Sequence, residues 1–312
     1  MKICMIGLGS IGVRHLCNLH TLLSERGVLP RIDAIRSLNR PLPLEAKMLL
    51  SDVYSAPQEA PDDYDAVFIT NPTSMHYETI ETMLGKTMHM FIEKPVFDRV
   101  VPDWKALPWR AGGIYYIACP LRYSRVIKYL KEYLLDRQIF SARCICSTYL
   151  PDWRPTADYR QSYSARAELG GGVRLDLIHE WDYLQYLFGV PSNVLVRHGK
   201  YSNLETSSED LAIYLAEYPD KLISVHLDYF GRAARREVEL YLEDEVVVGD
   251  IYDQRVRFLY KGTVVPLPQE RNAMQREEIA CFLDMLDGKC QNHNSVSQAV
   301  NTLQIALGEI SP

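Results

Sequence analysis

The chain has 312 residues, more than one hydrophobic core usually organises, so its length predicts two domains. The net charge is −6, from 34 Lys and Arg against 40 Asp and Glu, and no general surface for nucleic acid or an anionic membrane is expected. No apolar run approaches the ~18 residues that a membrane span needs. The histidines lack zinc-type clustering, so we expect no structural metal.

The seven cysteines form an odd set with no Cys-x-x-Cys pair. Cys144 and Cys146 would point the same way along a strand, which is more typical of buried thiols than of a disulfide. This usage indicates a reducing compartment, and we expect a cytoplasmic protein.

Apolar strands and helical segments alternate over the first 120 residues. Residues 2–6 are predicted as a buried strand and not as a signal peptide, because glycines, Arg14 and His15 follow at once. The alternation predicts βαβ units and a parallel sheet. Further strands are expected at 32–36, 65–70, 88–92 and 113–119, with helices at 11–24 and from Thr73 or Ser74, either of which can cap a helix.

The pattern changes after Pro120. Helices are expected at 124–135, 173–187, 273–287 and 295–310, and strands at 142–149, 194–199, 211–217, 221–230, 236–242, 245–250 and 255–259. We predict an α/β protein whose residues 1–120 form a dinucleotide-binding Rossmann domain with a doubly wound parallel sheet. Residues 121–312 would form an α+β domain with an open, mostly antiparallel sheet for substrate binding and oligomerisation.

A glycine turn at residues 7–12, Gly-Leu-Gly-Ser-Ile-Gly, follows the first strand and opens a helix. The first glycine permits a tight turn, the second lets the backbone approach a pyrophosphate, and the third allows close packing of helix on strand. Amide groups at the helix start would bind phosphate oxygens. An incidental glycine-rich turn is the alternative. The predicted cofactor contacts in the turn are Gly7, Gly9, Ser10, Ile11 and Gly12.

Residues at the end of the second strand would bind the adenosine ribose. NAD enzymes usually place Asp or Glu there, but this strand ends in Ile35-Arg36-Ser37 with Arg40 close behind, and Asp33 lies mid-strand. Arg36 and Arg40 can donate hydrogen bonds to a 2′-phosphate. We therefore favour NADP over NAD. The alternative is a solvated arginine face on an enzyme that uses NAD.

Glu93-Lys94-Pro95 ends the strand expected at 88–92. Ligands of open α/β sheets bind outside the carboxyl ends of the strands, and Pro95 restricts Lys94 to extended conformations. An ammonium group there can polarise a carbonyl or stabilise a developing alkoxide. We therefore predict that Lys94 lies at the reacting centre rather than being a solvated surface charge.

A second polar group follows residues 170–172, which are all glycine. Asp176 and His179 are three positions apart and would share one helical face. Imidazole can take a proton from a hydroxyl as hydride leaves, and a neighbouring carboxylate would orient the ring. The three glycines would let a substrate or a nicotinamide approach the backbone. A surface pair or a satisfied core pair is the alternative.

Together these motifs resemble the glucose–fructose oxidoreductase/inositol dehydrogenase (Gfo/Idh/MocA) family. The resemblance covers about residues 1–190 and implies that Lys94, Asp176 and His179 are catalytic. The commoner family pattern separates its Asp and His by four positions rather than three, so Glu180 is considered for part of the role. The resemblance places His76 near the cofactor, and the alternative is that His76 is a surface residue. The residues that the resemblance or their position puts near the cofactor are Thr70, Asn71, Pro72, His76 and Glu93.

The segment from residue 149 to residue 163 is unusually rich in Trp, Tyr and Arg. Aromatic faces stack on sugar rings, and arginines bind carboxylate or phosphate. The arrangement resembles a branch of the family found in surface-polysaccharide and acidic-sugar biosynthesis, with a loop at a subunit interface as the alternative. The candidate substrate contacts are Trp153, Tyr159, Arg160 and, from the start of the second domain, Arg122.

We therefore predict an NAD(P)-dependent oxidoreductase that transfers hydride between the nicotinamide and a secondary alcohol or ketone of a sugar or sugar derivative. One alternative is a lyase or glycosidase that recycles bound NAD without net redox change. Another is a regulator that binds the nucleotide without turnover. Because an open sheet needs covering, we expect a homodimer or homotetramer assembled through the C-terminal sheet.

Overall fold

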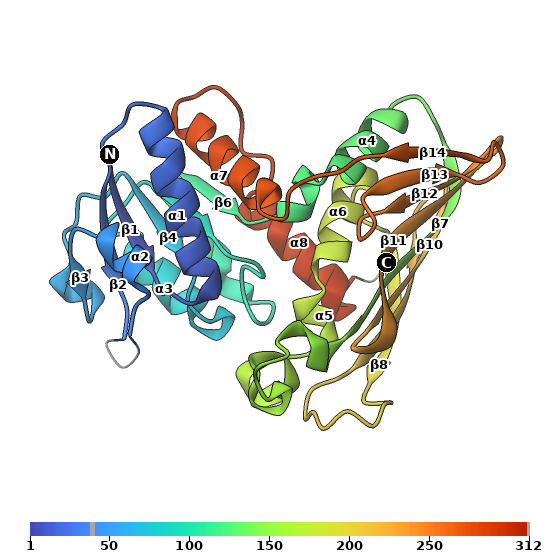
Figure 1. The fold of residues 1–312 in the computed structure, drawn as a ribbon, viewed down its shortest axis with the longest axis horizontal. Coiled ribbons are helices and arrows are strands. Elements are labelled where there is room, and N and C mark those ends of the chain that lie inside the picture. The colour runs from blue at the N-terminus through green and yellow to red at the C-terminus, as the bar shows by residue number, and fades with distance from the viewer. Residues whose placement is uncertain (38–40, 311–312) are drawn as a thin grey trace. The chain divides into compact units, whose positions relative to one another are not determined.

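The structure, a computed structural model, describes residues 1–37 and 41–310. The chain forms two compact units, one of Met1–Pro120 with Asn272–Val300 and the other of Leu121–Arg271 with Asn301–Pro312 (Figure 1). Residues 272–300 therefore lie in the first unit, although the sequence led us to expect them in the second domain. In the described part of the chain, no helix is long and apolar enough to cross a membrane.

A parallel sheet organises the first unit. Within the described residues it has six strands in the order β3-β2-β1-β4-β5-β6, which confirms the predicted Rossmann-type sheet. Strand β1 pairs with β2 on one side and β4 on the other, so the strand order reverses there, and such reversals are where open α/β sheets bind ligands. The strands are β1 (Lys2–Ile6), β2 (Arg31–Ile35), β3 (Val53–Tyr54), β4 (Ala66–Ile69), β5 (His89–Ile92) and β6 (Ile114–Ile117).

Helix α7 belongs to the first unit because its apolar face completes the core of that unit. The ring of Phe282 packs edge-on against Phe68 and Phe91, with centroids 5.5 and 5.6 Å apart. Asn272, next to the start of α7, exchanges two hydrogen bonds with Asn18 of α1, at 2.7 and 3.1 Å. The helices of this unit are α1 (Ser10–Glu25), α2 (Leu44–Met48), α3 (His76–Met83) and α7 (Ala273–Leu286), with short 3-10 helices η1 (Pro57–Glu59), η2 (Thr73–Met75) and η3 (Pro102–Ala106).

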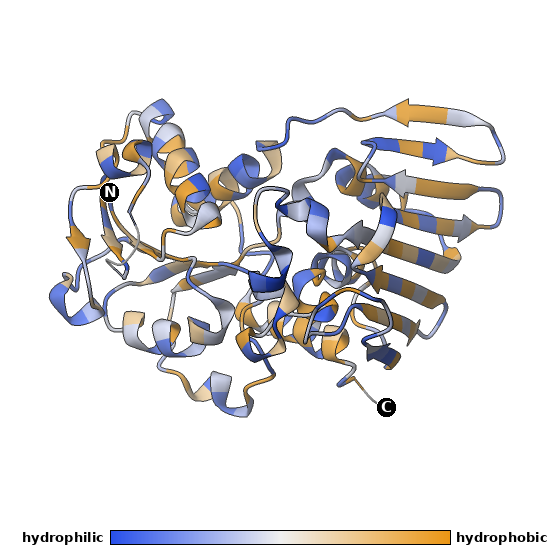
Figure 2. Ribbon diagram, turned by 60° about the horizontal axis from the view of Figure 1, so that its bottom comes forward, coloured by the Kyte–Doolittle hydropathy of each residue, from blue (hydrophilic) through white to orange (hydrophobic). Residues whose placement is uncertain are grey.

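A mostly antiparallel sheet organises the second unit, as predicted. Within the described residues it has eight strands in the order β14-β13-β12-β11-β7-β10-β9-β8, and only the β7–β10 pair is parallel. Its strands are banded orange and blue in Figure 2, because alternate residues face the core and the solvent. They are β7 (Ile139–Tyr149), β8 (Asn193–Gly199), β9 (Leu211–Glu217), β10 (Leu222–Asp228), β11 (Phe230–Leu242), β12 (Val246–Asp250), β13 (Arg255–Phe258) and β14 (Thr263–Pro266).

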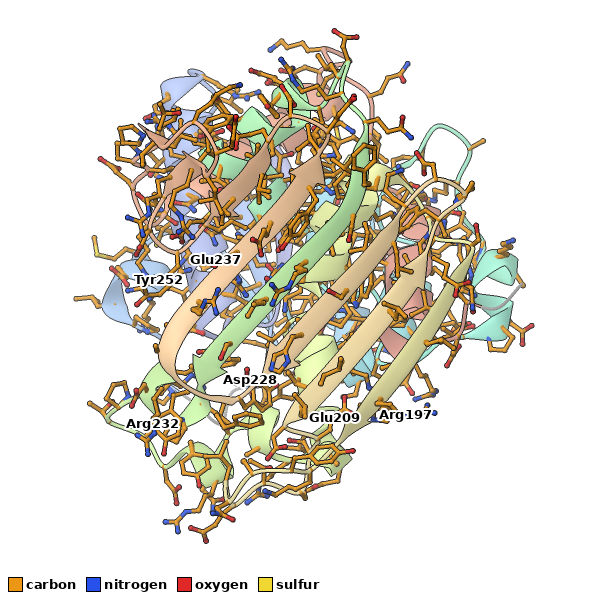
Figure 3. All side chains as sticks on the ribbon, turned by 90° about the vertical axis from the view of Figure 1, so that its right-hand side faces the viewer. Arg197, Glu209, Asp228, Arg232, Glu237 and Tyr252 are labelled. Carbon is orange, nitrogen blue, oxygen red and sulfur yellow. The ribbon has the colours of Figure 1, made fainter. Side chains whose placement is uncertain are left out.

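Helices cover one face of the second sheet, and the other face is open in Figure 3. Helix α4 approaches β12 so closely that a Cβ on Gly249 would lie 2.6 Å from Leu130. Helix α6 packs Trp181 edge-on against Tyr214, with ring centroids 5.1 Å apart. The helices of this unit are α4 (Arg125–Tyr133), α5 (Val173–Asp176) and α6 (His179–Phe188), with η4 (Pro120–Tyr123) at its start and α8 (Val296–Leu307) entering it from the first unit.

Two local predictions were wrong, and three short elements were missed. Residues 173–187 do not form one helix, because the backbone turns at Leu177 between α5 and α6. Neither Thr73 nor Ser74 caps α3, because a 3-10 turn comes first and Met75 occupies the N-cap. The elements α2 and β3 escaped prediction because each is too short to display a helical or strand period. Strand β14 also escaped prediction, although it is as long as the predicted β13.

Replacing Phe282 with Ala tests the place of α7 in the first core. The side chain is fully buried between aromatic rings, so F282A should lower the free energy of unfolding by about 3–5 kcal/mol. Urea unfolding measures this change. Leu29→Ala is the control, because that side chain in the same unit is 90% exposed, and it should have little effect. Equal small losses in both variants would contradict the assignment.

Candidate functional site

Two of the three glycines of the turn after β1, Gly7 and Gly12, are required by close contacts, and the third is not. Gly7 has a φ of +80°, and a Cβ there would lie 2.8 Å from the backbone of Asn71. A Cβ on Gly12 would lie 2.4 Å from the carbonyl oxygen of Gly7. A Cβ on Gly9, in contrast, would meet nothing within 4 Å. The turn therefore packs tightly against the sheet at Gly7 and Gly12 and leaves open space at Gly9, where a pyrophosphate fits.

The start of α1 has the electrostatic character that a phosphate requires. Its N-cap is Gly9, which makes no side-chain capping bond, and no acidic residue lies in the first turn. The helix begins with Ser10 and Ile11, so their amide groups and the positive end of the helix dipole lie at the turn. On the neighbouring strand end, the Thr70 hydroxyl donates to the carbonyl oxygens of Ile6 and Gly7 and holds the turn in place.

The tip of β2 presents Arg36 and Ser37 directly after the last strand residue. The backbone N–H of Arg36 donates to the Tyr54 carbonyl at 3.1 Å, which fixes the chain where the side chain leaves the strand. Asp33 is fully buried and accepts a hydrogen bond from the Tyr64 hydroxyl at 3.0 Å, so it is a core residue. Arg40, the other residue predicted to bind a 2′-phosphate, lies outside the described residues.

The carboxylate of Glu93 contacts helix α1 and is not exposed at the end of strand β5. His15 is fully buried, and its Nε2 lies 2.5 Å from Glu93 Oε1. The other carboxylate oxygen accepts the backbone N–H of Lys94 at 3.2 Å. Burial alone would raise the pKa of Glu93, but the hydrogen bond and charge of His15, with the charge of Lys94, hold that pKa below its ordinary value. Glu93 therefore orients the backbone that carries Lys94.

His76 connects the two loops that follow β4 and β5. The ring is 1% exposed, so the surface alternative is wrong. Its Nε2 lies 3.0 Å from the Asn71 carbonyl oxygen and its Nδ1 lies 3.0 Å from that of Pro95. Burial lowers the pKa of His76, although both carbonyls favour the protonated ring. His76 thus fixes the backbone next to Lys94, and its predicted place near the cofactor stays a prediction.

Asp176 and His179 lie on either side of the turn between α5 and α6, and not on one continuous helical face. The Tyr229 hydroxyl donates to Asp176 Oδ2 at 2.5 Å. Burial and then the neighbouring carboxylate raise the pKa of Tyr229 well above its usual range, so the phenol stays a donor. Tyr229 also packs edge-on against Trp153, with ring centroids 5.5 Å apart. The sequence did not identify this tyrosine, because it is distant along the chain.

The glycines at 170–172 serve the packing of their own loop, unlike the predicted approach of a ligand. Gly170 and Gly172 have φ values of +83° and +135°. A Cβ on Gly171 would lie 2.1 Å from the Tyr163 carbonyl oxygen. The loop therefore needs glycine at all three positions for backbone reasons, and these residues give no evidence for a bound substrate.

Two further candidates are buried in ion pairs. Arg122 is 4% exposed and binds both carboxylate oxygens of Asp182, at 2.7 and 3.0 Å. Glu180 is fully buried, with Oε1 2.8 Å from Nε of Arg236. These contacts place both side chains in buried ion pairs, and the predicted substrate contact of Arg122 and the predicted share of Glu180 in catalysis stay predictions.

The aromatic segment forms successive 3-10 turns, η5 (Leu150–Trp153), η6 (Tyr159–Gln161), η7 (Tyr163–Ala165) and η8 (Ala167–Leu169). Trp153 is 40% exposed and donates from Nε1 to the Thr148 hydroxyl at 2.7 Å. Arg160 is exposed and pairs with Asp158 at 2.8 Å. The Tyr159 hydroxyl accepts a backbone N–H at 3.0 Å. Of these, Trp153 is joined through Tyr229 to Asp176.

The parallel sheet, the glycine turn and the free start of α1 define a dinucleotide-binding Rossmann unit. Residues 1–107 match a family model described as an oxidoreductase family with an NAD-binding Rossmann fold, and residues 147–235 match the model of its C-terminal alpha/beta domain. The chain belongs to the Gfo/Idh/MocA oxidoreductase family.

Relatives with known names are distant. A myo-inositol 2-dehydrogenase of Thermotoga maritima is 28% identical over 198 residues, which is 61% of this chain and 55% of that protein. The chain spans about half the length of the curated relatives it matches. A UDP-N-acetylglucosamine 3-dehydrogenase from Acidithiobacillus ferrooxidans has a TM-score of 0.77 at 18% identity over 98% of this chain and 95% of that one. A levoglucosan dehydrogenase, in complex with NADH and levoglucosan, has a TM-score of 0.78 at 18% identity over 99% and 95%.

Replacing Glu93 with Gln tests the His15–Glu93 pair. Because the pKa of Glu93 is lowered in the folded state, its charge stabilises the fold above about pH 4.3, and this stability is lost as the pH falls through the folded pKa. The free energy of unfolding of E93Q near neutral pH should therefore be about 1.5–3 kcal/mol lower than that of the unaltered protein. This difference in the free energy of unfolding should become smaller at acidic pH, because Glu93 is then protonated.

Urea unfolding of both proteins across this pH range measures the effect. Glu25→Gln is the matched control, because Glu25 pairs with Arg276 at the surface, where an ion pair contributes about 0–1 kcal/mol. A Glu93→Gln difference that does not change with pH would contradict the pairing.

Proposed function

We propose that the protein transfers hydride between a nicotinamide cofactor and a secondary alcohol or ketone of a sugar or sugar derivative. The observation that carries this proposal is the position of Lys94 at the carboxyl end of β5. Gly7 and Asn71 follow β1 and β4 at the same edge of the same parallel sheet. An ammonium group beside a dinucleotide turn can stabilise the charge of a reacting oxygen.

Lys94, His179 and Asp176 have different proposed roles. A bound nicotinamide supplies or accepts the hydride. Lys94 stabilises negative charge on the substrate oxygen, and His179 accepts the hydroxyl proton during oxidation or returns it during reduction. Asp176, which accepts a hydrogen bond from the Tyr229 hydroxyl at 2.5 Å, is proposed to orient His179. Membership of an oxidoreductase family supports these assignments.

A sugar is the favoured substrate class. Trp153 presents a partly exposed aromatic face next to Tyr229, and Tyr229 binds Asp176. Aromatic faces of this kind stack on sugar rings. The relatives that act on inositol, levoglucosan and a UDP-sugar support the same class, and Tyr159 and Arg160 are further candidate contacts.

We also infer assembly through the open face of the second sheet, as a homodimer or homotetramer. Exposed apolar side chains lie on β8 and β9, with Leu195 at 54%, Ile213 at 45% and Leu215 at 37% exposure, and Leu195 pairs with Leu215 across the two strands. Neighbouring apolar side chains on β8 and β9 favour a protein partner over solvent. A second copy of the chain would cover the same surface on both partners.

Removing the Lys94 ammonium group tests the proposed reaction. Lys94→Ala and His179→Asn should each lower kcat by about 10²–10⁴-fold, because each removes charge stabilisation or proton transfer in the transition state. Reduction of NADP⁺ or NAD⁺ by a panel of sugars measures the rate. Lys105→Ala, which removes an exposed lysine of the first unit, should leave it unchanged.

The same assay separates the alternatives. Unchanged physiological activity in Lys94→Ala would favour a regulator that only binds the nucleotide. Substrate turnover with bound cofactor that is neither released nor consumed would favour internal redox chemistry.

We propose NADP(H) as the preferred cofactor, because Arg36 follows the strand tip and Asp33 is buried in the core. Arg36→Asp should weaken NADP⁺ binding by about 10-fold or more, since it replaces a donor to the 2′-phosphate with a repelling carboxylate. Calorimetric titration with NADP⁺ and NAD⁺ measures both affinities. Arg31→Asp, at the opposite end of the same strand, is the control. Tighter binding of NAD⁺ by the unaltered protein would overturn the preference.

A further inference from the structure

Two cysteine sulfurs lie in contact at the end of α7, in the first unit. Cys281 is in the helix, and Cys290 is in the loop that follows it. Their Sγ atoms are 3.8 Å apart, and the Cys290 sulfur also lies 3.6 Å from the Cys281 carbonyl oxygen. The nine-residue separation and the direct contact mean that small side-chain rotations suffice to bring the sulfurs to bonding distance.

The surroundings of the pair differ from those of the other thiols. Cys290 is exposed and Cys281 is half-buried. His293 Nε2 lies 3.7 Å from the Cys281 sulfur, close enough to accept its proton. Burial raises the pKa of Cys290 to about 11, and the neighbouring Cys281 contributes to that shift, so this thiol is mostly protonated at neutral pH and its exchange should become faster as the pH rises. The other thiols are, in contrast, buried at Cys4, Cys119, Cys144 and Cys146, and half-buried at Cys17.

We propose that Cys281 and Cys290 form a reversible disulfide by exchange with a small disulfide such as oxidised glutathione. The exposed Cys290 thiol releases its proton to water and its sulfur attacks one glutathione sulfur; the glutathione S–S bond breaks, and one glutathione leaves as a thiolate that takes up a proton. Cys281 passes its proton to His293 and attacks the Cys290 sulfur. The mixed disulfide bond breaks, and the second glutathione leaves as a thiolate that takes the proton from His293. Two protein thiols are oxidised, and one glutathione disulfide is reduced to two thiols.

The disulfide would fix the loop that covers the edge strand of the first sheet. In that loop the Asn292 side chain donates to the Tyr115 carbonyl oxygen at 2.9 Å. The Asn294 side chain donates to the Ile117 carbonyl oxygen at 2.9 Å, and the Asn294 carbonyl accepts the Ile117 N–H at 2.9 Å. Cys290 therefore lies just ahead of residues that pair with β6. Oxidation would link this edge to α7, which carries the core residue Phe282.

The experiment exposes the folded, reduced protein to oxidised glutathione and then blocks the remaining thiols with an alkylating reagent. Intact mass and peptide mapping identify the products. The unaltered protein should lose two alkylatable thiols, carry a 281–290 cross-link without glutathione, and recover both thiols in dithiothreitol. Cys281→Ser should retain glutathione on residue 290, because the resolving thiol is absent.

Two further variants complete the test. Cys290→Ser should give neither cross-link nor mixed disulfide at this place, and Cys17→Ser should form the cross-link as the unaltered protein does. The proposal is overturned if the unaltered protein stays reduced, if it keeps glutathione on Cys290 as fully as Cys281→Ser does, or if the cross-link forms only in urea. The measurement on the unaltered protein tests whether the 281–290 cross-link forms, even where a variant fails to fold.

Discussion

The contact between His15 and Glu93 is the interaction on which the proposed site depends. It joins the helix that opens at the glycine turn to the strand that ends in Lys94, with both side chains removed from most of the solvent. A carboxylate buried without a charged partner would cost several kcal/mol. The pair therefore fixes the register between the proposed phosphate-binding turn and the lysine, and His76 adds a second connection on the other side of Lys94.

The features that could be predicted from sequence are those with a local cause. Strands β1, β4 and β5 are short apolar runs bounded by turn residues, and Gly7 and Gly12 obey a spacing whose steric reason is known. Residues 194–199 and 211–217 were likewise predicted as strands, and they lie in β8 and β9. In each case the neighbours along the chain contain the physical reason for the structure.

The features that escaped prediction depend on residues distant in sequence. The partner of Glu93 is His15, and the partner of Asp176 is Tyr229. Neither pairing could be predicted from the spacing of neighbouring residues in the sequence. Residues 170–172 were interpreted as a place where a ligand approaches the backbone, yet a Cβ on Gly171 would meet carbonyl oxygens of residues 163–166, and Gly170 and Gly172 have positive φ angles. Arg122 illustrates the same limit, because a buried arginine with a carboxylate partner has the same sequence signature as a substrate-binding one.

The return of α7 to the first unit has a consequence for synthesis of the chain. Phe68 and Phe91 emerge from the ribosome long before Phe282, with residues 121–271 of the second unit translated in between. The nucleotide-binding unit therefore cannot close its aromatic core as an early, independent domain, although the six strands described for its sheet are complete by residue 117. Until α7 arrives, these rings stay an exposed apolar surface of the kind that chaperones bind, and any nascent chain that stops before α7 keeps it.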